Sequence, residues 1–161
     1  MLYHSEHGPA QDAYTTVVVP LDGSELAERV LPDGVEMAVA LRLKMVLVRA
    51  VSLPVLAQAW DAGSVVSYPA DLLGELEQDA QQYLDATAAG MKKRGFASCS
   101  TKVLRGVAGS IGSLLVDFVT SEPQAIVAMS SHGRSGIGRW VLGSIAEQIV
   151  HGTQAPTLIV R

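Results

Sequence analysis

The sequence predicts one α/β domain built on an open, doubly wound parallel sheet with helices on both faces. Five short apolar runs alternate along the chain with four segments of helical periodicity. Most of these runs are nearly continuous, as expected of strands that are buried on both faces. Of the 161 residues 48% are hydrophobic but only 5% are aromatic, so aliphatic side chains must form the core. Strands that alternate with helices in this way favour a parallel sheet.

The expected strands are short apolar runs bounded by turn residues. They lie at residues 15–20, 44–51, 98–104, 125–130 and 157–160. The third run alternates only weakly, whereas the last two are almost entirely aliphatic. Turn residues at both ends of a short aliphatic run indicate a strand and not a helix.

Apolar residues at spacings of three and four predict the helices between these strands. One stripe predicts a helix over residues 69–94, with Gly95 as its stop signal. A second stripe begins at Ile111, with Ser110 as the expected N-cap. A last helix is expected to span about residues 143–152.

Two segments depart from this regular alternation. The helix after the first strand is interrupted by Pro32 and Gly34, and Pro32 is expected to kink it or to end a first short turn. Residues 52–68 form a connection longer than most loops, a length typical of functional or mobile segments. Trp60 either anchors this connection or belongs to a flexible lid.

Composition and charge exclude several classes of protein. The chain fits one domain over residues 14–161, with residues 1–13 as a flexible tail outside the fold. The net charge of −4 and the absence of a dense Lys/Arg stripe exclude nucleic acid as an expected partner. Cys99 is the single cysteine, so no internal disulfide and no paired-cysteine metal site are possible. Without a run of 18 apolar residues or a signal-peptide pattern, we expect a cytoplasmic protein with no membrane association.

The loop after the first strand contains a candidate ligand-binding carboxylate. Ligands of open α/β sheets bind at the carboxyl ends of the strands. Pro20, Leu21 and Asp22 stand at such an end. Asp22 can accept a hydrogen bond from a ribose hydroxyl or from the edge of adenine. The alternative is that Asp22 caps the helix that follows.

The loop after the fourth strand has the composition of a phosphate cradle. Gly133, Gly136 and Gly138 let the backbone approach an anion closely. Gly143 and Ser144 stand where helix N–H groups are unpaired and the helix dipole is positive. The alternative is a surface loop whose glycines serve only its turns. The loop is neither a Walker A motif, nor a Rossmann fingerprint, nor a nucleophile elbow.

Two further side chains of this loop carry chemistry. Arg134 offers positive charge to an anion, and His132 can donate to a phosphate or to the local backbone. No second His, Cys or carboxylate is spaced to form a metal site with His132, so no protein metal site is expected.

Three segments together carry a family resemblance. They are VVVPLDGSELAERVL from residue 17, AIVAMSSHGRSGIGRWVLGSIAEQIV from residue 125, and the closing APTLIVR. In order and spacing they resemble the universal stress protein family over about residues 15–161. The resemblance implies an adenine nucleotide alpha hydrolase-like fold, with five parallel strands in the order 3-2-1-4-5. It also implies ATP as ligand, with or without Mg²⁺, and a homodimer that pairs the last strand, Thr157–Val160, across a two-fold axis.

The resemblance also implies a set of site residues. In ATP-binding members the loop reads G-x2-G-x9-G-[S/T], which Gly133, Gly143 and Ser144 match, whereas Ser130 replaces the first glycine. If that position needs a positive φ, serine costs about 1 kcal/mol more than glycine; otherwise its hydroxyl can contact the ligand. The implied site comprises Pro20, Leu21 and Asp22 at the adenosine end, Ala50 and Met129 beside adenine, and Ser130, His132, Gly133, Arg134, Gly143, Ser144 and Ile145 around ribose and phosphates.

The leading hypothesis from the sequence is an ATP-binding regulatory or stress-response dimer. One alternative is an interaction module of the same fold without nucleotide binding. Ser130 favours this alternative, and the intact Gly133, Gly143 and Ser144 oppose it. Another is a slow ATPase in which Mg²⁺ bridges the phosphates and Asp22. The sequence contains no recognisable general base or positioned nucleophile, so we expect slow ATP hydrolysis at most.

Overall fold

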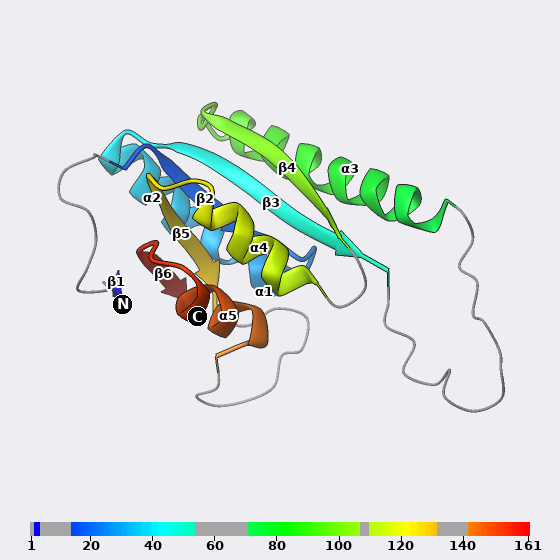
Figure 1. Cartoon of the computed structure of the whole chain (residues 1–161). Helices are drawn as coiled ribbons and strands as arrows, with labels where there is room; N and C mark the ends of the chain where they lie inside the picture. Colours follow the sequence, from blue (N-terminus) through cyan, green and yellow to red (C-terminus); the bar gives the residue numbers. More distant parts are fainter. Residues whose placement is uncertain (1, 4–13, 54–70, 107–109, 132–141) are drawn as a thin grey trace, which may run out of the picture.

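The computed structural model describes residues 2–3, 14–53, 71–106, 110–131 and 142–161 of the chain. Its centre is one sheet with the strand order β1-β6-β5-β2-β3-β4 (Figure 1). The strands are β1 (Leu2–Tyr3), β2 (Thr16–Pro20), β3 (Lys44–Ser52), β4 (Cys99–Gly106), β5 (Ala125–Ser130) and β6 (Thr157–Val160). The five strands from β2 to β6 all pair in parallel. Counted from β2 their order is 3-2-1-4-5, so the predicted fold is confirmed.

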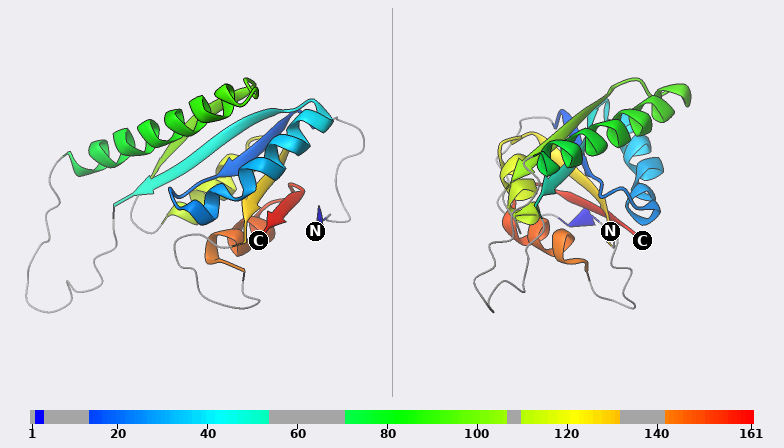
Figure 2. Two further views of the ribbon diagram at one scale, coloured as in Figure 1. Left: turned by 180° about the vertical axis from the view of Figure 1, so that it is seen from behind. Right: turned by 90° about the vertical axis from the view of Figure 1, so that its right-hand side faces the viewer.

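Helices cover both faces of this sheet, as the two further views show (Figure 2). They are α1 (Glu25–Glu28), α2 (Val30–Leu41), α3 (Leu72–Lys93), α4 (Ile111–Thr120) and α5 (Ser144–Gly152). Buried residues of α1, α2 and α3 share one apolar cluster with the sheet, and those of α4 and α5 share the other. The molecule therefore has three layers, with the sheet in the middle.

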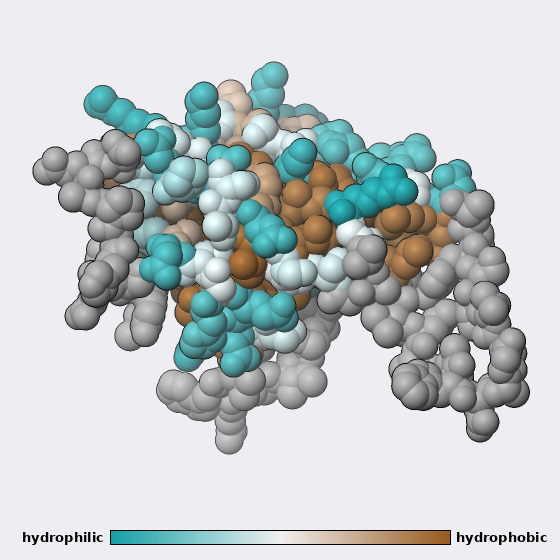
Figure 3. All heavy atoms as spheres, viewed as in Figure 1, coloured by the Kyte–Doolittle hydropathy of each residue, from teal (hydrophilic) through white to brown (hydrophobic). Residues whose placement is uncertain are grey.

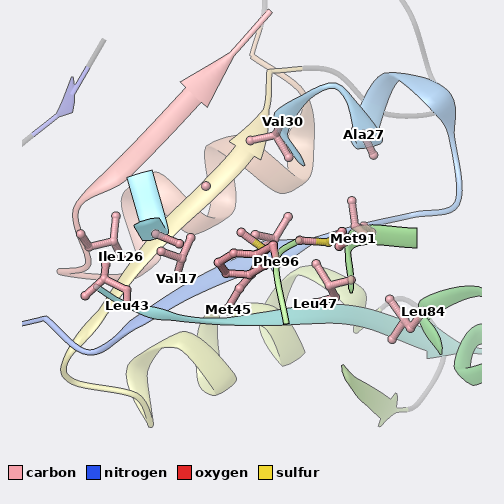
Figure 4. Close-up of a cluster of buried hydrophobic side chains, with 14 residues drawn as sticks. Val17, Ala27, Val30, Leu43, Met45, Leu47, Leu84, Met91, Phe96 and Ile126 are labelled. Atoms are coloured by element: carbon pink, nitrogen blue, oxygen red, sulfur yellow. The ribbon is translucent and has the colours of Figure 1, made fainter. Parts of the chain in front are cut away.

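Strand β2 shows why its apolar run is continuous. Val17 and Val19 belong to the cluster beneath α1, α2 and α3, while Val18 belongs to the cluster beneath α4 and α5. All three side chains are fully buried, because successive side chains of a strand point to opposite faces and both faces are covered. Each contributes about 1.5–3 kcal/mol through burial. Figure 4 shows the first cluster, in which Val17 lies beside Leu43 and Ile126, and Leu47 lies near Met91 and Leu84 of α3.

The first helical segment is divided into two helices by Pro32. Proline has no N–H to donate to the carbonyl of Glu28, four residues earlier, and its ring crowds that carbonyl. α1 accordingly ends at Glu28, and Pro32 falls in the first turn of α2, where a missing N–H costs nothing. Of the two expectations for Pro32, the end of a first short turn is confirmed.

Gly34 does not interrupt the helix, contrary to the prediction. It lies inside α2 and is buried. A Cβ at this position would lie 3.3 Å from Met45 Cε and 3.8 Å from Ala128 Cβ, so glycine lets α2 approach the sheet closely. Tertiary packing, and not a helix stop, is the reason for this glycine.

The face of the sheet beneath α4 is covered less completely. α4 contacts β3, β4 and α5. Val46, Ala50 and Leu104 lie at the margin of this cluster and are only partly buried. Figure 3 shows apolar residues, in brown, gathered on this side of the molecule. The N-terminal ends of α3 and α4 frame the carboxyl ends of β3 and β4 (Figure 1).

The start of the chain takes part in the sheet, in contrast to the expected tail. β1 pairs antiparallel with β6, Leu2 opposite Leu158 and Tyr3 opposite Thr157. The prediction that this segment stays outside the fold is therefore wrong for these two residues. Residues 4–13 and most of the long connection at residues 52–68, including Trp60, lie outside the described residues.

Candidate functional site

A cavity of about 410 Å³ lies at the carboxyl ends of β2, β3 and β5. The topology places it there, because β2 stands at the centre of the sheet between β3 and β5. At that point the chain leaves β2 toward one face and β5 toward the other, which opens a crevice between the two loops. The volume is within the range of small-molecule and cofactor sites.

The structure brings most of the predicted site residues together in the wall of this cavity. These are Pro20, Leu21, Asp22, Ala50, Met129, Ser130, Gly143, Ser144 and Ile145. The predicted residues His132, Gly133 and Arg134 lie outside the described residues. Segments separated by more than a hundred positions in the chain therefore meet at one cavity.

Several other wall residues were missed by the sequence analysis. The apolar ones are Ala27, Val51, Leu76, Ile111, Leu115 and Ala146, and the polar or charged ones are Arg49, Ser52 and Ser131. Only Arg49 carried a signal in the sequence, since it is the one charged residue inside the run MVLVRAV. A charged residue within a strand that is otherwise apolar indicates a specific partner, because charged groups are seldom buried unpaired.

Asp22 is held by hydrogen bonds to the start of α1. Its Oδ1 accepts from the backbone N–H of Ser24 at 2.9 Å and from the Ser24 hydroxyl at 2.6 Å. Ser24 Oγ in turn accepts from the N–H of Ala27 at 3.1 Å, so Ser24 is the N-cap of α1. The alternative that Asp22 itself caps this helix is therefore wrong. Asp22 fixes the capping residue and remains in the cavity wall.

The start of α5 forms the opposite side of the cavity. Gly143 is its N-cap, and among the described residues no side chain caps it. The carbonyl of Ser131 accepts from Gly143 N–H at 2.9 Å, and Ser131 N–H donates to the carbonyl of Val160 at 2.8 Å. Ser144 and Ile145 follow in the first turn and line the cavity. The N–H groups of a first turn have no partner within the helix, so this side suits an anion.

The backbone at Ser130 settles one question that the sequence left open. Ser130 is the last residue of β5. Among the described residues that are not glycine, Arg42 alone has a positive φ. Serine therefore carries no backbone strain at this position, and its place in the cavity wall leaves the hydroxyl as the feature that distinguishes it from glycine.

The described residues contain neither a membrane-spanning helix nor a cluster of metal ligands. No helix within the described ranges combines the length and apolar character that a membrane span requires. In the same part of the chain, no three His, Cys, Asp or Glu side chains are grouped so that they could hold a metal ion.

Comparison with known proteins adds a family and a set of related folds. The model of the universal stress protein family matches residues 13–161. Universal stress protein MJ0531 of Methanocaldococcus jannaschii is 23% identical over 155 residues, which cover 94% of this chain and 84% of the relative. The chain spans half the length of three mycobacterial universal stress proteins to which it is 26% identical.

Solved structures share the fold over nearly the whole chain. The universal stress protein of Archaeoglobus fulgidus in complex with dAMP superposes with a TM-score of 0.61 at 22% identity, covering 93% of this chain and all of the other. A universal stress protein in complex with cAMP gives a TM-score of 0.53 at 20% identity, covering 93% of this chain and 98% of the other.

Proposed function

The chain belongs to the universal stress protein family, whose model matches residues 13–161, and on that premise we propose that it binds an adenine nucleotide in the cavity described above. The observation that carries the proposal is the meeting in one cavity of a fixed carboxylate, Asp22, and the start of α5 at Gly143, which no side chain of the described residues caps. An adenosine with phosphates offers both matching parts, hydroxyls that donate to a carboxylate and an anion for a helix N-terminus. Relatives of this fold with dAMP and cAMP support the choice of adenine.

ATP is the form of the nucleotide that we propose. The adenosine end would lie against Pro20, Leu21 and Asp22, with Ala50 and Met129 beside the base. The phosphates would lie toward Ser130, Gly143, Ser144 and Ile145, and toward the loop that contains His132, Gly133 and Arg134. Mg²⁺ bound to ATP would be held chiefly by the phosphates, because Mg²⁺ keeps several waters and takes few protein oxygens.

The proposed role is regulatory and not catalytic. Among the described wall residues the polar side chains are Asp22, Arg49 and four serines, Ser52, Ser130, Ser131 and Ser144. Asp22, the only carboxylate among them, already accepts two hydrogen bonds from Ser24 and is poorly suited to take a proton from water. We propose a cytoplasmic stress-response protein, and cell fractionation would test its location.

Thermal unfolding tests nucleotide binding directly. A ligand that binds only the folded protein stabilises it by about 3 kcal/mol when present at a hundred times its dissociation constant. We expect millimolar ATP with Mg²⁺ to raise the melting temperature, and mass spectrometry of an acid extract to find adenine nucleotide in the purified protein. An unchanged melting temperature would contradict the proposal and favour an interaction module without nucleotide.

We also propose a homodimer through β6. This strand lies at the edge of the parallel sheet, and β1 pairs only with its first two residues, Thr157 and Leu158. Ile159 and Val160 lie beyond that pairing and are partly buried. A second copy of β6 would satisfy the remaining backbone groups of both strands at once. For pairing along the whole strand, β1 must leave β6.

Light scattering distinguishes the possible states of this edge. We expect the wild type at twice the monomer mass of 17.0 kDa, and Ile159→Pro shifted toward monomer because proline removes a backbone donor. Deletion of residues 1–13 should strengthen the dimer, since it removes β1 as a competitor for the same edge. A monomeric wild type at micromolar concentration, or a fully dimeric proline variant, would contradict dimerisation through β6.

A further inference from the structure

Arg49 occupies a position in the cavity wall that the proposed function does not yet use. It stands near the end of β3 on the face covered by α1, α2 and α3, and it is partly buried. Asp22 and Arg49 are the charged residues among the described residues of the wall. The contacts of the guanidinium therefore decide how it affects the ligand.

The guanidinium lies flat against Gly23, the residue that follows Asp22. A Cβ at Gly23 would be 3.2 Å from Nη1 and 3.3 Å from both Cζ and Nη2 of Arg49. Three nearly equal distances mean that the planar group faces the backbone of Gly23. Gly23 also has φ of +85°, which glycine adopts without strain. The turn that carries Asp22 thus rests on the plane of this side chain.

A tyrosine from α3 holds the guanidinium in place. Arg49 Cζ lies 5.0 Å from the centre of the Tyr83 ring, within the range of a cation–π contact. The Tyr83 hydroxyl donates to Glu28 Oε1 at 2.8 Å. Burial, and then this hydrogen bond, raise the pKa of Tyr83 above its ordinary value, so the hydroxyl keeps the proton that it donates.

These contacts close a ring around the Asp22 turn. Glu28 is the last residue of α1, and the N-cap of α1 is Ser24, which hydrogen-bonds to Asp22. The ring therefore runs from Asp22 through Ser24 and α1 to Glu28, on to Tyr83 and Arg49, and back to Gly23. Residues from β3, α1 and α3 together brace one short turn. Such bracing fixes the direction of a carboxylate before any ligand arrives.

We infer that Arg49 is a positioning residue, which orients the Asp22 carboxylate for the nucleotide by supporting Gly23. This inference rests on the proposed function in one respect, that Asp22 meets the ligand. The planar shape of arginine is essential, because lysine carries the same charge but cannot lie flat against a backbone or stack on a ring. Arg49 thereby acts through Asp22 and does not itself bind the phosphates.

A double-mutant cycle tests whether Arg49 acts through Asp22. We expect calorimetry to show ATP bound roughly tenfold or more weakly by Asp22→Asn, because a hydrogen bond to a charged group is lost. Arg49→Ala and Arg49→Lys should each bind several-fold more weakly than wild type. The double variant Asp22→Asn/Arg49→Ala should bind no more weakly than Asp22→Asn alone. Arg105→Ala is the matched control, since Arg105 on β4 is exposed and pairs with Glu77.

Hydrogen exchange of the nucleotide-free protein gives a second readout. The N–H of Ser24 donates to Asp22 Oδ1, so it should exchange slowly in wild type and in Arg105→Ala. We expect Arg49→Ala and Arg49→Lys to speed this exchange several-fold while circular dichroism stays native. This readout does not need ATP, so it separates the two proposals. A wild type that fails to bind ATP would overturn the proposed function, and the exchange rates would still show whether Arg49 supports the Asp22 turn.

Three results would overturn the inference. Additive losses of affinity in the double variant would mean that Arg49 contacts the ligand independently of Asp22. Wild-type affinity in Arg49→Lys would mean that charge alone matters. Unchanged exchange of the Ser24 N–H in both Arg49 variants would mean that the turn needs no support from the guanidinium.

Discussion

The two sides of the cavity are built in opposite ways. On the β2–β3 side the two charged groups already have protein partners, as Asp22 has in Ser24 and Arg49 has in the ring of Tyr83. On the β5–α5 side the first turn of α5 follows Gly143, and no side chain among the described residues caps it. The β2–β3 side therefore consists of side chains held by other side chains, whereas the β5–α5 side presents the backbone N–H groups of a first helical turn.

This difference separates two tasks in ligand binding. A braced carboxylate loses little freedom when a ligand arrives, so the β2–β3 side is suited to orienting the ligand. Helix N–H groups attract any suitable anion, so the β5–α5 side is suited to providing affinity for phosphate. We therefore expect changes near α5 to abolish binding, and changes near β3 to weaken it or to alter its selectivity.

The largest expected effect comes from Gly143→Val. The backbone at Gly143 has φ of −61° and ψ of 148°, which valine adopts readily, so the fold should be retained. The new side chain would occupy the space next to the first turn of α5, where we place the phosphates. We expect calorimetry to detect no ATP binding, a loss on the order of a hundredfold or more.

Gly90→Val is the matched control for this change. Gly90 lies inside α3, and a Cβ built there meets nothing within 4 Å. The same substitution at Gly90 should leave both ATP affinity and the circular dichroism spectrum unchanged. Wild-type affinity in Gly143→Val would mean that the phosphates bind elsewhere.

The strands were predictable because their signal is local. The runs at residues 125–130 and 157–160 match β5 and β6 at both ends, since unbroken aliphatic runs with turns around them favour buried strands. Gly34 was misinterpreted for the same reason. A glycine in a helical pattern indicates a stop locally, whereas its role here depends on Met45 and Ala128 from distant strands.

In the candidate site, too, the residues with a local signal in the sequence could be predicted and the others could not. The loops after β2 and β5 could be found from glycines, a carboxylate and the topology, and the cavity wall contains residues of both. The bracing of Asp22 could not be found, because Arg49, Tyr83 and Glu28 have no recognisable spacing in the sequence and meet only in the folded chain. The pairing of β1 with β6 was missed because two residues carry no periodicity.

A smaller effect is expected from Ser130→Gly, which tests the β5–α5 side at its side chain. Ser130 ends β5 and has no positive φ, so glycine relieves no strain there. If the hydroxyl donates to the nucleotide, its removal should weaken ATP binding several-fold, as the loss of one neutral hydrogen bond would. Calorimetry of both proteins in the same buffer measures the change.

Ser100→Gly separates this effect from the general cost of glycine in a strand. Ser100 lies on β4, outside the cavity wall, and should lose a little stability but no affinity. Tighter ATP binding by Ser130→Gly would mean that the side chain crowds the ligand. An unchanged affinity would mean that the β5–α5 side binds through its backbone alone.

The smallest effect is expected from Tyr83→Phe, which removes one hydroxyl from the braced side but keeps the ring beneath Arg49. At pH 7 the loss of the hydrogen bond to Glu28 should lower the free energy of unfolding by about 1 kcal/mol or less, since both side chains are partly exposed.

The same hydroxyl makes the stability depend on pH. Burial raises the pKa of Tyr83 above its ordinary value of about 10, so above pH 10 the folded chain keeps a proton that the unfolded chain releases. This contribution to stability is complete below pH 10 and is lost as the pH rises further. Urea unfolding at pH 7 and at pH 10.5 should therefore show a smaller drop in the free energy of unfolding for Tyr83→Phe than for wild type. An equal drop in both proteins would mean that the Tyr83 proton does not stabilise the braced side.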